Sequence, residues 1–175
     1  VETVGVGQSE TSVREMVDVF ALLLIGGAGD EVQGIKRGIV EMADLVVVHK
    51  ADSGNEYICK DTASAYRSSL HLFPKPQGEH TVEVLTASSY TGDGHDRFRS
   101  KIQGLIDLWN KNGYFSTQRS SQQVKRMKVH AMEILMSTHM NSPSSKKVWD
   151  ELKKDVEKGE ISAYSAAWTW SKSKK

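Results

Sequence analysis

Hydrophobic residues gather in three short runs along the chain, separated by segments with helical spacing. The runs are Val19–Ile25, Leu45–His49 and Thr81–Ser88. The first two are continuous rather than alternating, which is typical of strands covered on both faces of a sheet. Because the runs alternate with helical segments, the pattern predicts an α/β fold, a parallel sheet with helical crossovers.

Three segments between and after these runs carry apolar residues at spacings of three and four, as amphipathic helices do. They cover residues 30–44, 61–73 and 96–113, and Gly113 is the expected stop of the last helix. The apolar faces expected to be buried are Val32, Ile35, Ile39 and Met42; Ala65, Leu70 and Phe73; and Phe98, Ile102, Leu105, Ile106 and Trp109.

After Tyr114 the strand signal disappears and only helical patterns follow. Two apolar stripes are expected, the second stopped by Gly159: Val124, Met127, Ala131, Ile134 and Leu135, then Val148, Trp149, Leu152 and Val156. The series Met127, Met132, Met136 and Met140 is interpreted as a packed helix face. The pattern therefore predicts two domains, residues 1–113 as α/β and residues 114–175 as an all-helical extension.

Net charge, the length of the apolar runs and the cysteine content exclude or disfavour several classes of function. The 175 residues carry a net charge of +1, so no strong field favours nucleic acid or an anionic membrane as a partner. No apolar run approaches the roughly 20 residues of a membrane helix. Cys59 is the only cysteine, which excludes an intramolecular disulfide, and the histidines show no metal-ligand spacing with it.

The stretch VVVHKAD, residues 46–52, places a lysine and an aspartate just past a predicted strand. GTPases read guanine with this spacing: a carboxylate such as Asp52 accepts hydrogen bonds from the ring N–H and the exocyclic amine, and the Lys50 stem can lie along the base. The usual motif begins with Asn, where this chain has His49. The alternative interpretation is an ordinary polar turn at the end of a strand.

Two further elements fit a guanine-nucleotide site by their order along the chain. Ser88 and Ser89 follow the next strand, where GTPases close over the base with small residues. Near the start, Glu2 and Gly5 have the spacing of the Asp-x-x-Gly turn that meets the γ-phosphate, with Glu in place of Asp. Each element is weak alone, and the three in this order favour a guanine-nucleotide site.

Three long runs carry a more specific resemblance: ETVGVGQSE, GAGDEVQGIKRGIVEMAD and HKAD. They closely resemble the MeaB/ArgK family of P-loop GTPases, SIMIBI class, whose eukaryotic branch is the methylmalonic aciduria type A proteins. The resemblance is strong from Val1 to about Asp52, moderate through SSYTGDG and STQRSSQQ, and fades after about Met140. The family's Gly-x-x-x-x-Gly-Lys-Ser/Thr loop has no match in the chain, which is expected to be the C-terminal part of a longer GTPase.

The resemblance implies a function and its residues. The parent would bind GTP or GDP with Mg²⁺, hydrolyse GTP, and act as a chaperone of adenosylcobalamin-dependent methylmalonyl-CoA mutase, with GTP gating cofactor loading or protection. Glu2 would hold Mg²⁺ through water and, with Gly5, belong to the catalytic site; His49, Lys50, Asp52, Ser88 and Ser89 would bind the nucleotide. Within the glycine-rich stretch 26–38, Asp30, Gln33 and Lys36 would form a switch coupled to the mutase.

The implied partners are the mutase, the cobalamin adenosyltransferase and a second copy of the protein, with STQRSSQQ at the start of a dimerisation arm. Localisation would be the mitochondrial matrix in a eukaryote and the cytoplasm in a bacterium. Two alternatives stay open. One is a helical dimerisation and partner-binding module with no nucleotide chemistry in this chain. The other, a Rossmann oxidoreductase, is disfavoured because GVGQSE lacks the third glycine.

Overall fold

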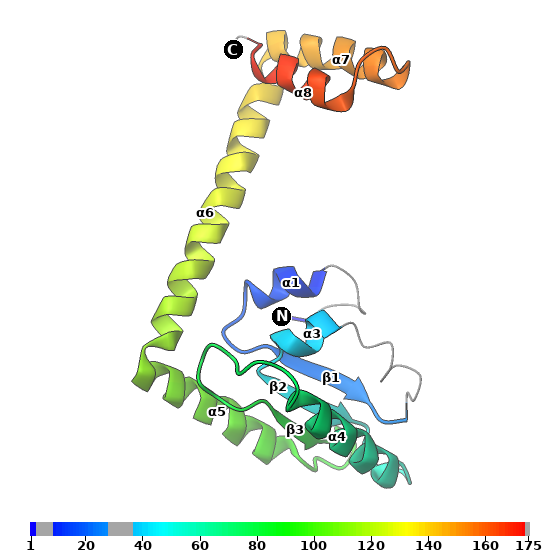
Figure 1. The fold of residues 1–175 in the computed structure, drawn as a ribbon, viewed down its shortest axis with the longest axis vertical. Coiled ribbons are helices and arrows are strands. Elements are labelled where there is room, and N and C mark those ends of the chain that lie inside the picture. Colours follow the sequence, from blue (N-terminus) through cyan, green and yellow to red (C-terminus); the bar gives the residue numbers. More distant parts are fainter. Residues whose placement is uncertain (3–8, 28–36, 174–175) are drawn as a thin grey trace. The chain divides into compact units, whose positions relative to one another are not determined.

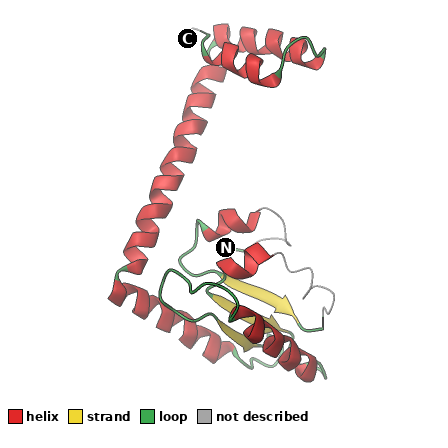
Figure 2. Cartoon of the chain, in the orientation of Figure 1, coloured by secondary structure: helices red, strands yellow, loops and turns green. Residues whose placement is uncertain are grey.

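The structure, a computed structural model, describes residues 1–2, 9–27 and 37–173. Those residues form two compact units, Val1–Gln122 and Gln123–Lys175. The long helix α6 (Tyr114–Met140) begins in the first unit and continues into the second (Figures 1 and 2).

The first unit is built on a three-stranded parallel sheet in the order β1-β2-β3. The strands are β1 (Ala21–Ile25), β2 (Leu45–His49) and β3 (Glu83–Thr86). Leu23 pairs with Val47, and Val47 with Leu85, so the strands are in register across the sheet. The predicted α/β fold with a parallel sheet is confirmed; β2 has the bounds of its apolar run, and β1 and β3 are shorter than theirs.

Helices cover both faces of this sheet. Alternate strand residues, among them Val46 and Val48, pack with Val13 of α1 (Ser9–Arg14), Val40 of α3 (Arg37–Met42) and Tyr66 of α4 (Glu56–Leu70). On the opposite face, Leu45, Val47, Leu85 and Ala87 pack against Phe98 and Ile102 of α5 (His95–Asn112). Because side chains alternate along a strand, one continuous apolar run supplies both cores.

Several details differ from the sequence expectations. Strand β1 is not covered on both faces by the described residues: Leu23 is 62% exposed and Ile25 is 55% exposed. Helix α4 starts five residues before the predicted segment and buries Cys59, Ala63 and Tyr66, while Ala65 is exposed. Leu70 and Phe73 of the predicted face pack against the same core, so the expectation is wrong for Ala65 only.

Helix α5 and its end follow the prediction closely. Gly113 adopts the left-handed conformation at φ 78°, which a glycine tolerates and which stops the helix after Asn112. Trp109 on the predicted stripe is fully buried and makes edge contacts with His80 and Tyr114. Of the segment 30–44, the described helix runs from Arg37 to Met42; Val32 and Ile35 lie outside the described residues.

The second unit is helical throughout its described residues, as predicted beyond Tyr114. Helix α7 (Pro143–Glu157) begins after Ser142 and half-buries the stripe Val148, Trp149, Leu152 and Val156; helix α8 (Ala163–Ser171) packs against it. Trp170 lies edge-on to Trp149, with ring centroids 4.8 Å apart, and its Nε1–H donates to the Ser145 carbonyl at 3.0 Å.

The C-terminal part of α6 differs from the interpretation as a packed face. Apolar side chains along it are largely exposed in this chain: Val124, Met127, Met132, Ile134 and Leu135 each have more than half of their surface accessible. Helical spacing identified the stripe, but nothing among the described residues covers it.

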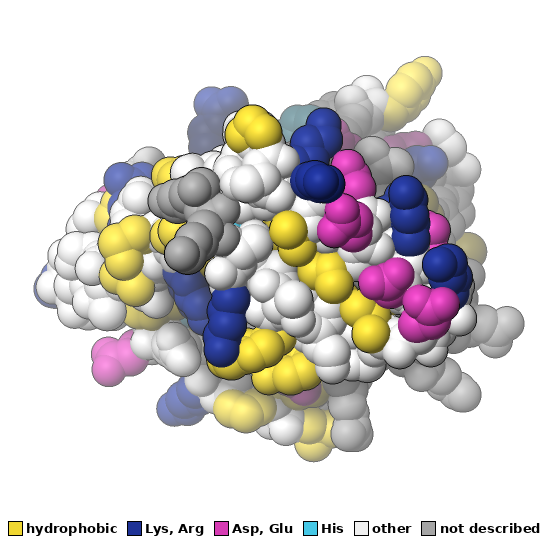
Figure 3. Space-filling model, turned by 90° about the horizontal axis from the view of Figure 1, so that it is seen from above, with side chains coloured by type: hydrophobic (Ala, Val, Ile, Leu, Met, Phe, Trp, Pro, Cys, Tyr) yellow, Lys and Arg dark blue, Asp and Glu magenta, His cyan; other side chains and the backbone are white. Residues whose placement is uncertain are grey.

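The surface carries mixed charge. On the face drawn in Figure 3, Lys and Arg side chains lie among Asp and Glu, with hydrophobic side chains between them. Across the described residues, none of the helices combines the length and apolar character needed to cross a membrane.

Candidate guanine-nucleotide site

The predicted nucleotide residues meet at the carboxyl edge of the sheet. His49 ends β2, and Ser88 follows β3 by two residues. Two backbone hydrogen bonds extend the ladder beyond the strands, from Ala87 N to Val48 O at 3.0 Å and from Ala51 N to Ala87 O at 3.1 Å. The loops after β2 and β3 are therefore tied together where ligands of open α/β sheets bind.

Ser88 connects these two loops through its side chain. Its hydroxyl donates to Asp52 Oδ2 and accepts from the backbone N–H groups of Tyr90 and Thr91, each at 3.1 Å. Because the two N–H groups occupy the acceptor positions of this fully buried hydroxyl, its one proton is directed at the carboxylate. The orientation of Asp52 is thus fixed from the neighbouring loop.

Asp52 is prepared to accept hydrogen bonds as a carboxylate. The hydrogen bond from Ser88 is the main reason that its pKa lies below the ordinary value; desolvation opposes this shift, and Ser53, His49 and Lys50 add smaller lowering contributions. The side chain is partly exposed. A carboxylate offers about four acceptor positions, so two hydroxyl partners leave room for the paired N–H donors of a guanine.

His49 and Ser89 form a second link between the loops. His49 Nε2 lies 2.7 Å from Ser89 Oγ, and the tautomer of the ring decides which atom donates. Lys50 is exposed, and its backbone is left-handed at φ 59°. The five residues expected to bind the nucleotide therefore belong to one constellation built from two loops.

The other predicted site residues are not part of this constellation as described. Glu2 is an exposed residue at the start of the chain. Gly5, Asp30, Gln33 and Lys36 lie outside the described residues. The Asp52 carboxylate suits the paired N–H donors of a guanine base, and the described residues contain no group of three or more His, Cys, Asp or Glu that could hold a metal ion.

Two residues beside the site, Asn55 and Cys59, belong to none of the motifs found in the sequence. Asn55 Nδ2 donates to the Lys50 carbonyl at 3.2 Å, and the Cys59 thiol lies 3.6 Å from the carbonyls of His49 and Lys50. Asn55 follows Gly54 at the start of a helix, so its sequence signal is that of an N-cap. The burial of Cys59 had no local signal.

A second polar cluster lies at the opposite, amino edge of the sheet. Asp44 directly precedes β2 and is 2% exposed. It accepts hydrogen bonds from the Phe20 N–H at 2.8 Å and from Arg14 Nη2 at 3.1 Å, and His80 Nε2 lies 3.5 Å away. Burial raises the pKa of Asp44 to about 6 and lowers that of His80 to about 4.

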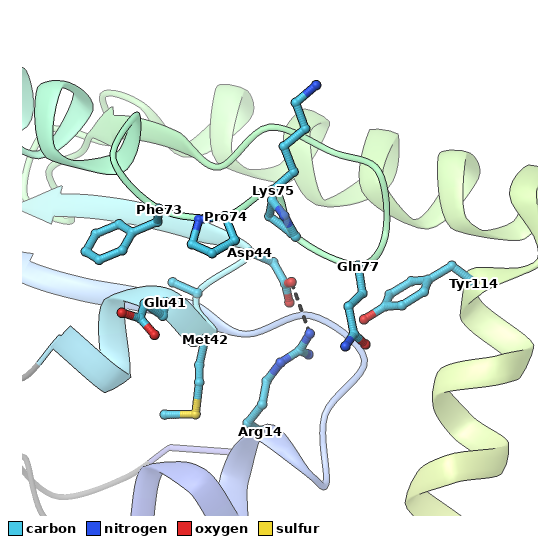
Figure 4. Close-up of a pocket in the computed structure, with 11 residues that line it drawn as sticks. Arg14, Glu41, Met42, Asp44, Phe73, Pro74, Lys75, Gln77 and Tyr114 are labelled. Atoms are coloured by element: carbon cyan, nitrogen blue, oxygen red, sulfur yellow. Dashed lines mark hydrogen bonds and ion pairs between the residues drawn. The ribbon is translucent and has the colours of Figure 1, made fainter.

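This cluster borders a cavity of about 380 Å³ (Figure 4). Arg14 reaches from α1 to Asp44, and Lys75 points away from both. The lining consists of Arg14, Glu41, Met42, Ala43, Asp44, Phe73, Pro74, Lys75, Pro76, Gln77 and Tyr114. The cavity is separate from the carboxyl-edge site because their residues do not overlap, and its carboxylate, Asp44, already accepts hydrogen bonds from Arg14 and Phe20.

The fold and the carboxyl-edge constellation define the class: an α/β protein of the P-loop GTPase type. A solved structure titled LAO/AO transport system kinase matches 97% of this chain with a TM-score of 0.69 and 29% identity, covering 54% of that chain. The family model for the methylmalonyl Co-A mutase-associated GTPase MeaB matches residues 1–144. The chain belongs to the MeaB family of GTPases.

Curated relatives agree with this assignment. A relative from Caulobacter vibrioides is 39% identical over 167 residues, 95% of this chain and 51% of that protein. GTPase ArgK of Escherichia coli is 37% identical over 137 residues, covering 78% of this chain and 41% of that protein. The mouse methylmalonic aciduria type A homolog, described as mitochondrial, is 34% identical over 167 residues, 95% of this chain and 40% of that protein. The chain thus spans about half the length, or less, of these relatives.

Proposed function

We propose that this chain forms the guanine-reading part of a GTPase. The observation that carries the proposal is the Asp52 carboxylate, oriented at the carboxyl edge by the hydrogen bond from Ser88, which also lowers its pKa. Guanine presents a ring N–H beside an exocyclic amine, and one carboxylate can accept from both. Adenine lacks this donor pair, so it would leave the carboxylate without its partners.

The remaining nucleotide residues complete the proposal. The Lys50 stem lies along the base face, and Ser89, linked to His49, closes the pocket. Glu2 holds Mg²⁺ through water and, with Gly5, senses the γ-phosphate. The 175 residues contain no Gly-Lys pair, so we expect the chain by itself to bind GTP weakly and to show no measurable hydrolysis.

The family description supports a partner for the whole protein. Its name associates the GTPase with methylmalonyl-CoA mutase. We propose that GTP gates cofactor loading or protection of that mutase, that Asp30, Gln33 and Lys36 couple the two proteins, and that the cobalamin adenosyltransferase is a further partner. The relatives described as mitochondrial support the matrix as the location if the source is a eukaryote, and the cytoplasm applies to a bacterial source.

A second proposed function concerns residues 114–175 as a dimerisation and partner arm. The supporting observation is the exposed apolar stripe of α6, which includes Met127 and Leu135 at 66% and 67% exposure. Apolar stripes of this kind on a helix commonly mark a protein interface. Light scattering of the purified protein tests the homodimer: a dimer supports the arm, and Met127→Lys combined with Leu135→Lys should then give a monomer.

The guanine-reading proposal is tested in the full-length protein by comparing GDP and ADP binding. Asp52→Ala should reduce the preference for GDP by roughly 100-fold, because the two donors of guanine lose their shared acceptor. Asp61→Ala, which removes the same charge at an exposed position of α4, is the matched control and should leave the preference unchanged. An unchanged GDP-to-ADP ratio in Asp52→Ala would exclude Asp52 as the base-reading residue.

Partner coupling is tested by turnover with and without methylmalonyl-CoA mutase. Lys36→Ala and Asp30→Ala should reduce the stimulation by the mutase more than the basal rate. If Lys36→Ala keeps full stimulation, the switch role proposed for this residue is wrong.

A further inference from the structure

The turn between β2 and α4 contains backbone that needs support. Lys50 and Ser53 both have left-handed conformations, at φ 59° and 55°, although each carries a Cβ. Residues other than glycine avoid this region because Cβ crowds the following carbonyl. Asp52 lies between them, so the direction of its carboxylate depends on whatever holds the turn in this shape.

Asn55 occupies the N-cap position of α4 but does not act as a cap. Among the described residues its side chain makes no capping hydrogen bond; instead Nδ2 reaches back to the Lys50 carbonyl at 3.2 Å. The backbone closes the same loop, since the Asn55 N–H donates to the Asp52 carbonyl at 2.9 Å. One residue therefore ties both the start and the middle of the turn.

Cys59, one helical turn after Asn55, contacts the same turn through its side chain. Its thiol lies 3.6 Å from the carbonyls of both His49 and Lys50 and 3.5 Å from Asn55 Nδ2. The side chain is fully buried, and that burial raises the pKa of the thiol, so it stays protonated and can donate. The carbonyls of the turn thus meet donors from α4, which fixes the turn to the helix.

We infer that Asn55 is a positioning residue for guanine recognition, holding the Lys50–Asp52 turn in the shape that directs the Asp52 carboxylate to Ser88 and to the base. The inference rests on the proposed function of Asp52. It assigns Asn55 a role distinct from helix capping, for which serine and aspartate would serve as well.

That distinction gives the test. In the full-length protein, Asn55→Ser and Asn55→Asp each keep a residue able to cap α4 but remove the amide donor to Lys50. Binding of GDP and ADP is measured together with thermal unfolding. We expect the Kd for GDP to rise about tenfold, the effect of one lost hydrogen bond on placement of the carboxylate, with ADP binding unchanged. If one variant fails to fold, the other decides.

Asn112→Ser is the matched control. It removes a similar bond, from Asn112 Nδ2 to the Gly78 carbonyl at 3.2 Å, which lies away from the turn. This variant should keep the GDP affinity of the wild type even if its unfolding temperature falls.

Each outcome decides a different claim. A tenfold loss for GDP in the Asn55 variants and none in Asn112→Ser supports the positioning role. GDP affinity within twofold of wild type in the Asn55 variants, while Asp52→Ala loses its base preference, overturns the role of Asn55 and leaves the proposed function intact. An unchanged base preference in Asp52→Ala overturns both.

Discussion

Two aspartates flank strand β2, and their surroundings are opposite. Asp44, before the strand, is buried, and its carboxylate receives the Phe20 N–H and the Arg14 guanidinium, with His80 adjacent. Asp52, after the strand, is partly exposed and is held by hydroxyl groups that lower its pKa. Burial instead raises the pKa of Asp44 to about 6.

The comparison separates a structural carboxylate from one available to a ligand. The oxygens of Asp44 are both used by internal donors, which tie β1, α1 and the start of β2 together. The oxygens of Asp52 keep acceptor positions toward the surface. Residue type and distance from the strand are therefore insufficient to assign a role; burial of the carboxylate and the use of both its oxygens by internal donors decide it.

The largest expected difference between the two edges is in stability. Asp44→Ala should lower the free energy of unfolding by about 3 kcal/mol, because it leaves the Arg14 charge and the Phe20 N–H without their partner. Asp52→Ala should leave stability close to that of the wild type. Urea unfolding of both variants measures this, and equal losses would contradict the contrast.

A smaller loss of stability is expected for a substitution at the carboxyl edge, at Gly26, which directly follows β1. A Cβ at Gly26 would lie 2.5 Å from Cys59 Sγ and 3.0 Å from its Cα, so Gly26→Ala should destabilise by about 1–3 kcal/mol. Gly104→Ala in α5 is the control, since within the described structure a Cβ there meets nothing within 4 Å. Thermal unfolding compares the two variants. Equal unfolding temperatures would show that the structure around Gly26 shifts to accept the added methyl group without loss of stability.

The amino edge should also show compensating pH effects. The pKa of Asp44 is about 6 in the folded protein, above its unfolded value of 3.8, so the folded state binds the proton more tightly. The contribution of Asp44 to the free energy of unfolding therefore falls as pH rises from about 4 to 6. The folded pKa of His80, about 4, lies below its unfolded value of 6.5, so its contribution rises over nearly the same range.

When one of the two groups is removed, the pH dependence of the free energy of unfolding should be that of the remaining group. Asp44→Asn should make stability increase with pH between about 4 and 6.5, and His80→Phe should make it decrease between about 4 and 6, each by at most about 1.4 kcal/mol per pH unit. Urea unfolding across this range measures both slopes. Variants that keep the flat profile expected of the wild type would show that the two groups do not titrate in this way.

The smallest effect is expected for an exposed ion pair near the amino edge. Arg119 of α6 contacts Asp18 through two hydrogen bonds, at 2.7 and 2.6 Å, and both side chains are partly exposed. Arg119→Ala should lower the Tm by no more than about 2 °C, and less at 1 M salt, because solvent and ions screen such pairs. A larger, salt-independent loss would instead point to the packing of Arg119 on Phe115.

Local signals predicted most of the fold and part of the site. Continuous apolar runs located the strands, and Gly113 located the end of α5. The order of HKAD and the serines placed His49, Asp52 and Ser88 at one sheet edge, where the structure has them, while their binding roles stay predictions. Helical spacing located the apolar stripe of α6, but the spacing did not indicate that the stripe is exposed.

The sequence by itself determined the alternation of strands and helices and the family resemblance, because both depend on residues close together in the chain. Only the tertiary structure decided which carboxylate is internal and which is available. The partners of Asp44 lie 24, 30 and 36 residues away along the chain at Phe20, Arg14 and His80, and Ser88 lies 36 residues from Asp52. No local period encodes such pairs, since packing of separate segments on the sheet creates them.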